Sequence, residues 1–172
     1  MKKFIYPSPA EISEALARPS AGTGDIDRSV REVLARVRDE GDVALREFSE
    51  KFDGYAPASI KVDETELTEA AKLIPEELRK AMLMAHSNIT AFHSEQLKGT
   101  QVVNTAEGVK CWSRDVAIEK VGLYIPGGTA PLFSTVMMLA IPARLAGCRD
   151  IILCTPPGKD GRVSPLILHA AW

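Results

Sequence analysis

Residues 121–136 read Val121-Gly-Leu-Tyr-Ile-Pro-Gly-Gly-Thr-Ala-Pro-Leu-Phe-Ser-Thr-Val136. A short apolar strand leads here into a loop of glycine and proline, and an apolar helix follows the loop. This order places backbone N–H groups at the start of a helix, where the helix dipole favours anions. The glycines allow positive φ angles and the close approach of a ligand. The segment therefore predicts either a ligand-binding loop or a tight strand-to-helix turn, in which the glycines only permit the backbone conformation.

The residues that follow continue the alternation of strand and helix. A helix is expected over residues 134–145, and the unbroken apolar run over residues 151–154 is typical of a strand buried on both faces. Ser164-Pro165 then begins another helix. Residues 118–172 therefore predict the start of a parallel-sheet, incomplete Rossmann-like domain. Ligands of such sheets bind beyond the carboxyl ends of the strands, where the loop over residues 126–131 is expected.

Residues 1–117 predict a mostly helical region with short strands, so the fold class is α/β with a helix-rich N-terminal region. Apolar residues recur at helical spacing at Ile26, Val30, Leu34 and Val37, which indicates a helix with one buried face. Helices are expected over about residues 9–17, 25–40, 42–53, 64–74 and 76–98, a loop over residues 20–24, and strands over residues 60–62, 101–104, 109–116 and 118–125.

The composition describes a globular chain of nearly balanced charge. Its 172 residues are 45% hydrophobic, which suffices for one domain, or one domain and part of another. The 21 basic and 23 acidic residues give a formal net charge of −2, without a basic stripe or an acidic tail. Apolar runs are too short to span a bilayer, and the N-terminus lacks the core of a signal peptide. We therefore expect a soluble, cytoplasmic protein that binds neither nucleic acid nor membranes.

The cysteines and histidines form no pattern typical of a metal or redox site. Cys111, Cys148 and Cys154 are odd in number, and their spacing matches no zinc or redox motif. His86 and His93 lie on one predicted helix with Cα atoms roughly 10 Å apart, too far to share one metal easily. The cysteines are therefore interpreted as small apolar side chains in a reducing compartment, and the two histidines as surface or packing residues.

The remaining titratable residues also favour structural roles. His169 has no carboxylate or cysteine near it in the sequence. Glu76 and Glu77 alternate with Arg79 and Lys80 at helical spacing, which indicates a solvated helix face. The sequence shows no paired carboxylates, catalytic triad or cluster of metal ligands.

Neither standard nucleotide fingerprint is present, because the chain lacks both G-x-G-x-x-G and a Walker lysine. Tyr124 precedes the loop and can stack on a nucleotide or hydrogen-bond to it. Thr129 and Ser134 offer hydroxyl groups near the next helix.

The sequence resembles the histidinol dehydrogenase family in several blocks that occur in the same order. The most specific block is residues 121–136, which continues into Met138-Leu-Ala-Ile-Pro-Ala-Arg-Leu-Ala-Gly147. The upstream blocks are Gly41-Asp-Val-Ala-Leu-Arg-Glu-Phe48, Lys51-Phe-Asp-Gly54 and Asn88-Ile-Thr-Ala-Phe-His93. The resemblance extends from about residue 25 to the end of the sequence.

This resemblance implies an NAD-dependent oxidation of L-histidinol to L-histidine in two steps, the last reaction of histidine biosynthesis. Members of the family are zinc-dependent homodimers. Zinc orients the substrate, a glutamate–histidine pair transfers protons, and NAD accepts each hydride. A metal that polarises the substrate and a histidine that titrates near neutral pH suit such chemistry.

The resemblance also implies roles for particular residues. Tyr124 matches a family residue that contacts NAD, and Pro126, Gly127 and Gly128 form the adjoining loop, so all four are expected to bind the cofactor. Ser134 is expected to face the same cleft. The zinc ligands and the glutamate–histidine pair of the family correspond to positions beyond this sequence. The chain resembles about the first two fifths of the family protein, and we expect it to be inactive alone.

Three hypotheses follow. The chain is the N-terminal portion of a histidinol dehydrogenase, or a non-catalytic truncated module with weak nucleotide or anion binding, or an unrelated α/β domain that binds anions or partners. A segment that carries the remainder of the family protein would favour the first hypothesis, and its absence the second. The incomplete sheet also leaves the strand at Ile151 as an open edge, so the chain is expected to self-associate or to have low stability alone.

Overall fold

The structure is a computed structural model that describes residues 3–17, 24–128, 130–158 and 160–172. The chain divides into two compact units, Met1–Leu45 and Arg46–Trp172, which are considered separately. The elements, in chain order, are α1 (Pro9–Leu16), α2 (Gly24–Glu40), α3 (Asp42–Asp53), α4 (Glu64–Lys72), α5 (Glu76–Ser94), β1 (Val102–Ala106), β2 (Val109–Trp112), β3 (Lys120–Tyr124), α6 (Phe133–Leu145), β4 (Asp150–Cys154) and α7 (Pro165–Ala171). Helices and parallel and antiparallel strands together confirm the α/β class. No helix in the described ranges is long and apolar enough to cross a membrane.

The first unit begins with the capped helix α1. Ser8 accepts a hydrogen bond from the backbone N–H of Glu11, while the Glu11 carboxylate accepts one from the backbone N–H of Ser8 at 2.8 Å. That backbone hydrogen bond lowers the pKa of Glu11. Helix α2 follows as predicted, but Ile26 and Leu34 on its apolar stripe are exposed, so the expected buried face is wrong for the described residues. The few elements of this unit do not supply enough surface to cover the stripe. Residues 20–23 of the expected loop lie outside the described ranges.

The helices of the second unit follow the sequence signals closely. Asp63 caps α4 by accepting a hydrogen bond from the Glu66 backbone N–H at 2.8 Å. Helix α5 ends at Ser94, four residues before the predicted end, because the backbone tightens there into turns in which Gln96 N–H bonds to the His93 carbonyl. Residues 60–62 were expected to form a strand, but residues 60 and 61 form bends and residue 62 has no regular structure. The described strands pair as β1–β2 and β3–β4, so this segment has no partner strand to hydrogen-bond.

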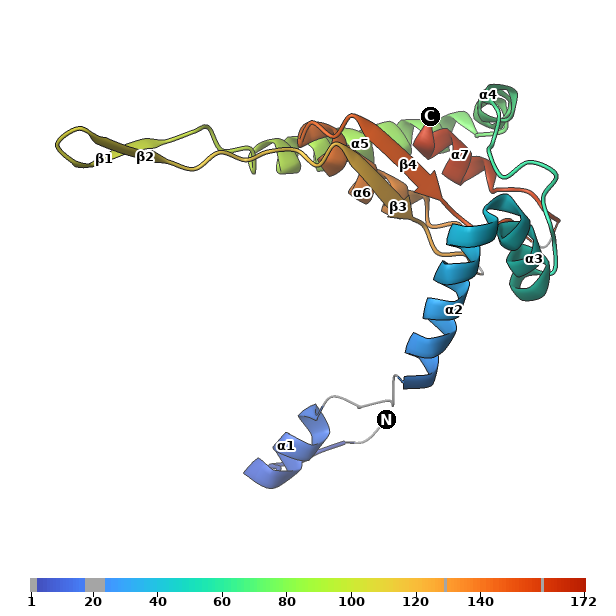
Figure 1. Cartoon of the computed structure of the whole chain (residues 1–172), viewed down its shortest axis with the longest axis horizontal. Helices are drawn as coiled ribbons and strands as arrows, with labels where there is room; N and C mark the ends of the chain where they lie inside the picture. The colour runs from blue at the N-terminus through green and yellow to red at the C-terminus, as the bar shows by residue number, and fades with distance from the viewer. Residues whose placement is uncertain (1–2, 18–23, 129, 159) are drawn as a thin grey trace. The chain divides into compact units, whose positions relative to one another are not determined.

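Strands β1 and β2 form an antiparallel hairpin around Gly108, as the turn signal predicts. Gly108 has a φ of 76°, a left-handed conformation that glycine adopts without steric cost. Strand β2 ends at Trp112, before the predicted end. Every residue of both strands is exposed, including Val103 and Trp112, so the hairpin is a ribbon without a covered face (Figure 1).

The predicted strand–helix–strand–helix order is present in β3, α6, β4 and α7. Strands β3 and β4 are parallel neighbours, in register from Lys120 opposite Asp150 to Tyr124 opposite Cys154 (Figure 1). The core on one side of this pair consists of Ile125, Val136 of α6 and Ile167 of α7, all buried. Leu153, Val163 and Ala170 pack against it. Helices α6 and α7 therefore cover the same face of the two-stranded sheet.

The other face of the sheet is open. Side chains along β3 and β4 alternate between half-buried and exposed, and Ile152 is 63% exposed. The prediction that residues 151–154 are buried on both faces is therefore wrong for the described chain. A parallel strand becomes fully buried only when helices cover both faces of its sheet, and here α6 and α7 cover one.

Candidate functional site at the carboxyl ends of two parallel strands

The carboxyl ends of β3 and β4 lie side by side, because the strands are parallel and in register. Tyr124 stands opposite Cys154, and one residue further on Ile125 N–H donates to the Cys154 carbonyl at 2.9 Å. The loops that leave the two strands therefore start at the same edge of the sheet. This is the edge at which open parallel sheets bind their ligands.

The two loops come into direct contact at Gly127. A Cβ atom added to Gly127 would lie 2.7 Å from Cγ of Pro156, which is closer than carbon atoms tolerate. Glycine is therefore required here for the loops to approach each other. Between the loops is a hollow of about 150 Å³, called here the strand-end hollow. It is lined by Pro126, Gly127, Gly128, Ala130, Pro131, Thr155, Pro156, Pro157, Gly158, Ser164 and Ile167.

The strand-end hollow suits binding better than acid–base chemistry. None of its described lining residues carries a charged side chain. Its polar groups are backbone amides and the hydroxyls of Thr155 and Ser164. The Thr155 hydroxyl oxygen is buried and has no hydrogen-bond partner among the described residues. A buried hydroxyl without a partner is costly, so a ligand group that bonds to it would gain free energy.

The structure places the sequence-predicted residues in and around this hollow. Pro126, Gly127 and Gly128 line it, as the loop position predicts. Tyr124 does not line it; this residue ends β3 and its side chain is 63% exposed. Ser134 is exposed in the first turn of α6 and is not among the lining residues. Thr129 lies outside the described residues.

Sequence reasoning missed the second wall of the hollow. Thr155, Pro156, Pro157 and Gly158 follow β4 and face the loop after β3. Their position was the available signal, since they come directly after the second strand of a predicted parallel pair. The contact between Gly127 and Pro156 joins residues far apart in the sequence and becomes visible only in three dimensions.

A larger hollow of about 520 Å³ lies elsewhere, on the helix-covered face of the sheet. Its floor includes Leu123, Ile151 and Leu153, three of the four inward-facing side chains of the two strands. Arg144 and Arg149 also line it. Apolar side chains on the inner face of a sheet are normally covered by helices, so this hollow is better explained as incomplete packing than as a ligand site.

The histidines of the described chain do not line the strand-end hollow. No group of three His, Cys, Asp or Glu residues lies close enough there to hold a metal ion. Nδ1 of His93 lies 2.7 Å from the Gln96 side-chain oxygen, a local contact at the end of α5. His169 lies on α7, and its Nδ1 is buried without a partner among the described residues.

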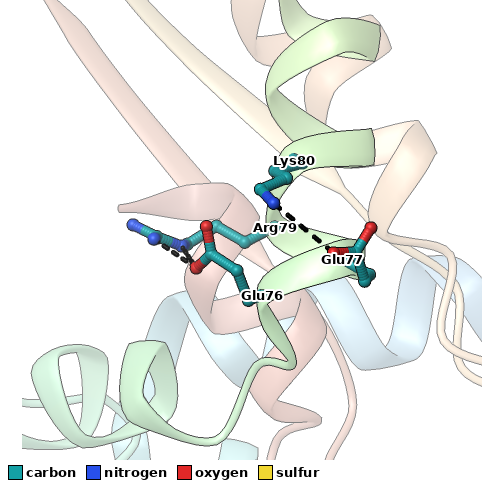
Figure 2. Close-up of polar contacts among 4 residues, drawn as sticks. All are labelled: Glu76, Glu77, Arg79 and Lys80. Atoms are coloured by element: carbon teal, nitrogen blue, oxygen red, sulfur yellow. Dashed lines mark hydrogen bonds and ion pairs between the residues drawn. The ribbon is translucent and has the colours of Figure 1, made fainter.

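The acidic residues at the start of α5 are engaged in ion pairs with their helical neighbours. Arg79 donates to Glu76, with its Nε 3.0 Å from the carboxylate, and Lys80 Nζ lies 3.4 Å from Glu77 (Figure 2). All four side chains are exposed. Each pair joins residues three positions apart on one helix, as expected for the predicted solvated face.

Comparison with known proteins identifies the family. The family model described as "Histidinol dehydrogenase" matches residues 16–172. The chain belongs to the histidinol dehydrogenase family. It is 50% identical to histidinol dehydrogenase of Bacteroides thetaiotaomicron over 171 residues, which are 99% of this chain and 40% of that protein. The corresponding protein of Bacteroides fragilis is 51% identical over the same length and share.

A solved histidinol dehydrogenase supports the fold as well. The crystal structure of the enzyme from Elizabethkingia anophelis matches with a TM-score of 0.90 at 43% identity. The match covers 98% of this chain and 39% of that one. The chain thus spans about two fifths of the length of these histidinol dehydrogenases. The sequence-based family assignment is confirmed.

Proposed function

We propose that this chain supplies part of the NAD-binding site of a histidinol dehydrogenase. The complete protein would oxidise L-histidinol to L-histidine in two steps. In the first, the alcohol carbon passes a hydride to one NAD⁺ and the hydroxyl loses its proton, which gives an aldehyde. In the second, the aldehyde takes up water, and the hydrate passes a hydride to a second NAD⁺ and loses a hydroxyl proton, which gives the carboxylic acid of L-histidine. The observation that carries the proposal is the strand-end hollow, which lies where a parallel sheet holds a nucleotide.

The hollow fits a portion of the cofactor. Its volume of about 150 Å³ is smaller than the roughly 300–1,000 Å³ of pockets that enclose a drug-sized ligand. A dinucleotide therefore extends beyond it. We propose that Pro126, Gly127 and Gly128 approach the cofactor with their backbone, and that Tyr124 at the adjacent strand end offers its exposed ring for stacking.

The described residues do not fit a zinc site, because no suitable set of donors is gathered in them. The zinc that the family resemblance implies is therefore a proposal for the complete protein, and no residue of this chain is assigned to it. The homodimeric state and the cytoplasmic location are likewise proposals for the complete protein. The described chain supports the cofactor-binding part of the proposal.

The exposed apolar surface is consistent with a role inside a larger protein. The outer face of the β3–β4 sheet exposes Ile152, and the hairpin exposes Val102, Val103 and Trp112. Contiguous exposed apolar surface marks interaction sites in folded proteins. The chain spans about two fifths of the length of the related enzymes, so we expect it to expose surfaces of this kind.

The residue proposed to contact the cofactor most directly is Tyr124. We define the hybrid enzyme as this chain joined to the part of the Bacteroides thetaiotaomicron histidinol dehydrogenase that lies beyond its matched segment. In it, Tyr124→Ala is expected to raise the KM for NAD about tenfold, since loss of a stacked ring and its contact area costs roughly 1–2 kcal/mol. Steady-state kinetics with varied NAD measures the change.

Tyr124→Phe and Phe92→Ala serve as controls for this variant. Tyr124→Phe keeps the ring and is expected to retain most of the affinity for NAD. Phe92 is another exposed aromatic residue, on α5, and does not line the strand-end hollow, so its removal is expected to leave the KM for NAD unchanged. An unchanged KM in Tyr124→Ala would refute the assigned contact.

A further inference from the structure

The ring of Tyr55 lies against the backbone of the turn between β4 and α7. Tyr55 follows α3 by two residues and is 39% exposed. A Cβ atom added to Gly161 would lie 2.6 Å from Cζ of Tyr55 and 2.7 Å from its Cε2. The ring therefore occupies the space that any other residue at position 161 would need. A residue just after α3 is thus in contact with a loop more than a hundred positions further along.

The turn that Tyr55 touches is closed by its own hydrogen bonds. Gly158 N–H donates to the Arg162 carbonyl at 2.8 Å, and Gly161 N–H donates to the Gly158 carbonyl at 2.9 Å. The Arg162 N–H donates to the Asp160 carboxylate at 3.1 Å. These bonds link Gly161, where the ring packs, directly to Gly158, which lines the strand-end hollow. A displacement at Gly161 is therefore expected to move Gly158 in the wall of the hollow.

The position of that wall determines the width of the hollow. Pro156, Pro157 and Gly158 form the side that faces Gly127 and its neighbours. The Gly127–Pro156 contact limits how close the two sides come. Tyr55 contacts the turn that follows this wall at Gly161.

We propose that Tyr55 is a positioning residue for the nucleotide site. Its ring supports the turn between β4 and α7 and so keeps the second wall of the strand-end hollow in place for NAD. Tyr55 is not a lining residue and needs no contact with the cofactor. The inference rests on the proposed function, because it assumes that the hollow binds NAD.

The test uses the hybrid enzyme and the separation of KM from kcat. Tyr55→Ala is expected to raise the KM for NAD about fivefold, within the range of indirect coupling seen for positioning residues, with kcat and the KM for histidinol nearly unchanged. Tyr55→Phe keeps the ring and is expected to restore the KM for NAD. A uniform loss of kcat, or an unchanged KM for NAD, would overturn the proposal.

A second variant approaches the same contact from the other side and does not depend on the stability of Tyr55→Ala. Gly161→Ala introduces the Cβ that collides with the ring, and is expected to raise the KM for NAD similarly. Gly108→Ala is the matched control, because Gly108 has nearly the same φ (76° against 74°) but open space around its Cβ position. Equal effects of the two variants on the KM for NAD would overturn the proposal.

The double variant Tyr55→Ala/Gly161→Ala completes a double-mutant cycle with the two single variants. Removal of the ring removes the collision, so in that background Gly161→Ala is expected to add no more to the KM for NAD than the strain of alanine at a φ of 74° causes. The outcomes also separate this proposal from the proposed function. A hybrid enzyme that never uses NAD refutes both, whereas one that responds to Tyr124→Ala but not to the Tyr55 and Gly161 variants refutes the positioning role alone.

Discussion

Replacement of Ile125 by alanine is expected to lower the free energy of unfolding of the chain by about 3 kcal/mol, within the range for large-to-small substitutions in a core. Ile125 is fully buried and contacts the cluster formed with Val136 and Ile167. It is also the first residue after β3, so its side chain anchors the start of the loop that lines the strand-end hollow. Urea unfolding followed by circular dichroism measures the loss.

The sheet itself offers the matched control. Ile152→Ala removes the same atoms from the neighbouring strand, but the Ile152 side chain is on the open face and 63% exposed. Its substitution is expected to change the free energy of unfolding by less than about 0.5 kcal/mol, as at most exposed sites. Equal losses for the two variants would show that the core is not on the side where α6 and α7 lie.

Gly127→Val is expected to have the second largest effect, because it forces apart the two loops that form the hollow. Its Cβ would begin 2.7 Å from the Pro156 ring, whose atoms cannot rotate away. Overpacking of this kind costs roughly 1–3 kcal/mol. We expect lower stability of the chain and, in the hybrid enzyme, a rise of at least about tenfold in the KM for NAD.

The control for this variant is Gly99→Val. No described atom lies within 4 Å of a Cβ at Gly99, and its backbone is not left-handed. It is expected to leave both stability and the KM for NAD nearly unchanged. If Gly127→Val were as harmless as Gly99→Val, the close approach of the two loops would be unimportant for the cofactor.

The local elements were predictable because their signals are local. Ser8 and Asp63 cap their helices with side chains that stand three residues from their hydrogen-bond donors. Gly108 marks the hairpin turn, and the alternation of strand and helix after residue 118 predicts the parallel pair. Each of these features depends on the chemistry of a few neighbouring residues.

Burial was harder to predict, because it depends on what lies next to an element. The run over residues 151–154 has the composition of a fully buried strand, yet Ile152 is exposed in the described chain. The apolar stripe of α2 at Ile26 and Leu34 is exposed for a related reason. Apolar patterning indicates which faces of an element need to be covered. It does not indicate what covers them, and the chain spans only about two fifths of the length of the related enzymes.

The candidate site was predictable on one side. The Gly–Pro loop after β3 stands out in the sequence, and Pro126, Gly127 and Gly128 do line the hollow. The opposite wall at Thr155 and Pro156 depends on strand register, which the sequence does not specify. The binding roles of Tyr124 and of this loop stay predictions, which a measurement of NAD binding tests.

The most direct test of the central claim is NADH formation by the hybrid enzyme with L-histidinol and NAD⁺. The account predicts histidinol-dependent NADH formation, two NADH for each histidine produced, and none from the 172-residue chain alone. A folded hybrid enzyme that forms no NADH would contradict the claim and favour a module with only weak nucleotide or anion binding. Turnover by the 172-residue chain alone would contradict the view that the remaining part of the enzyme is required.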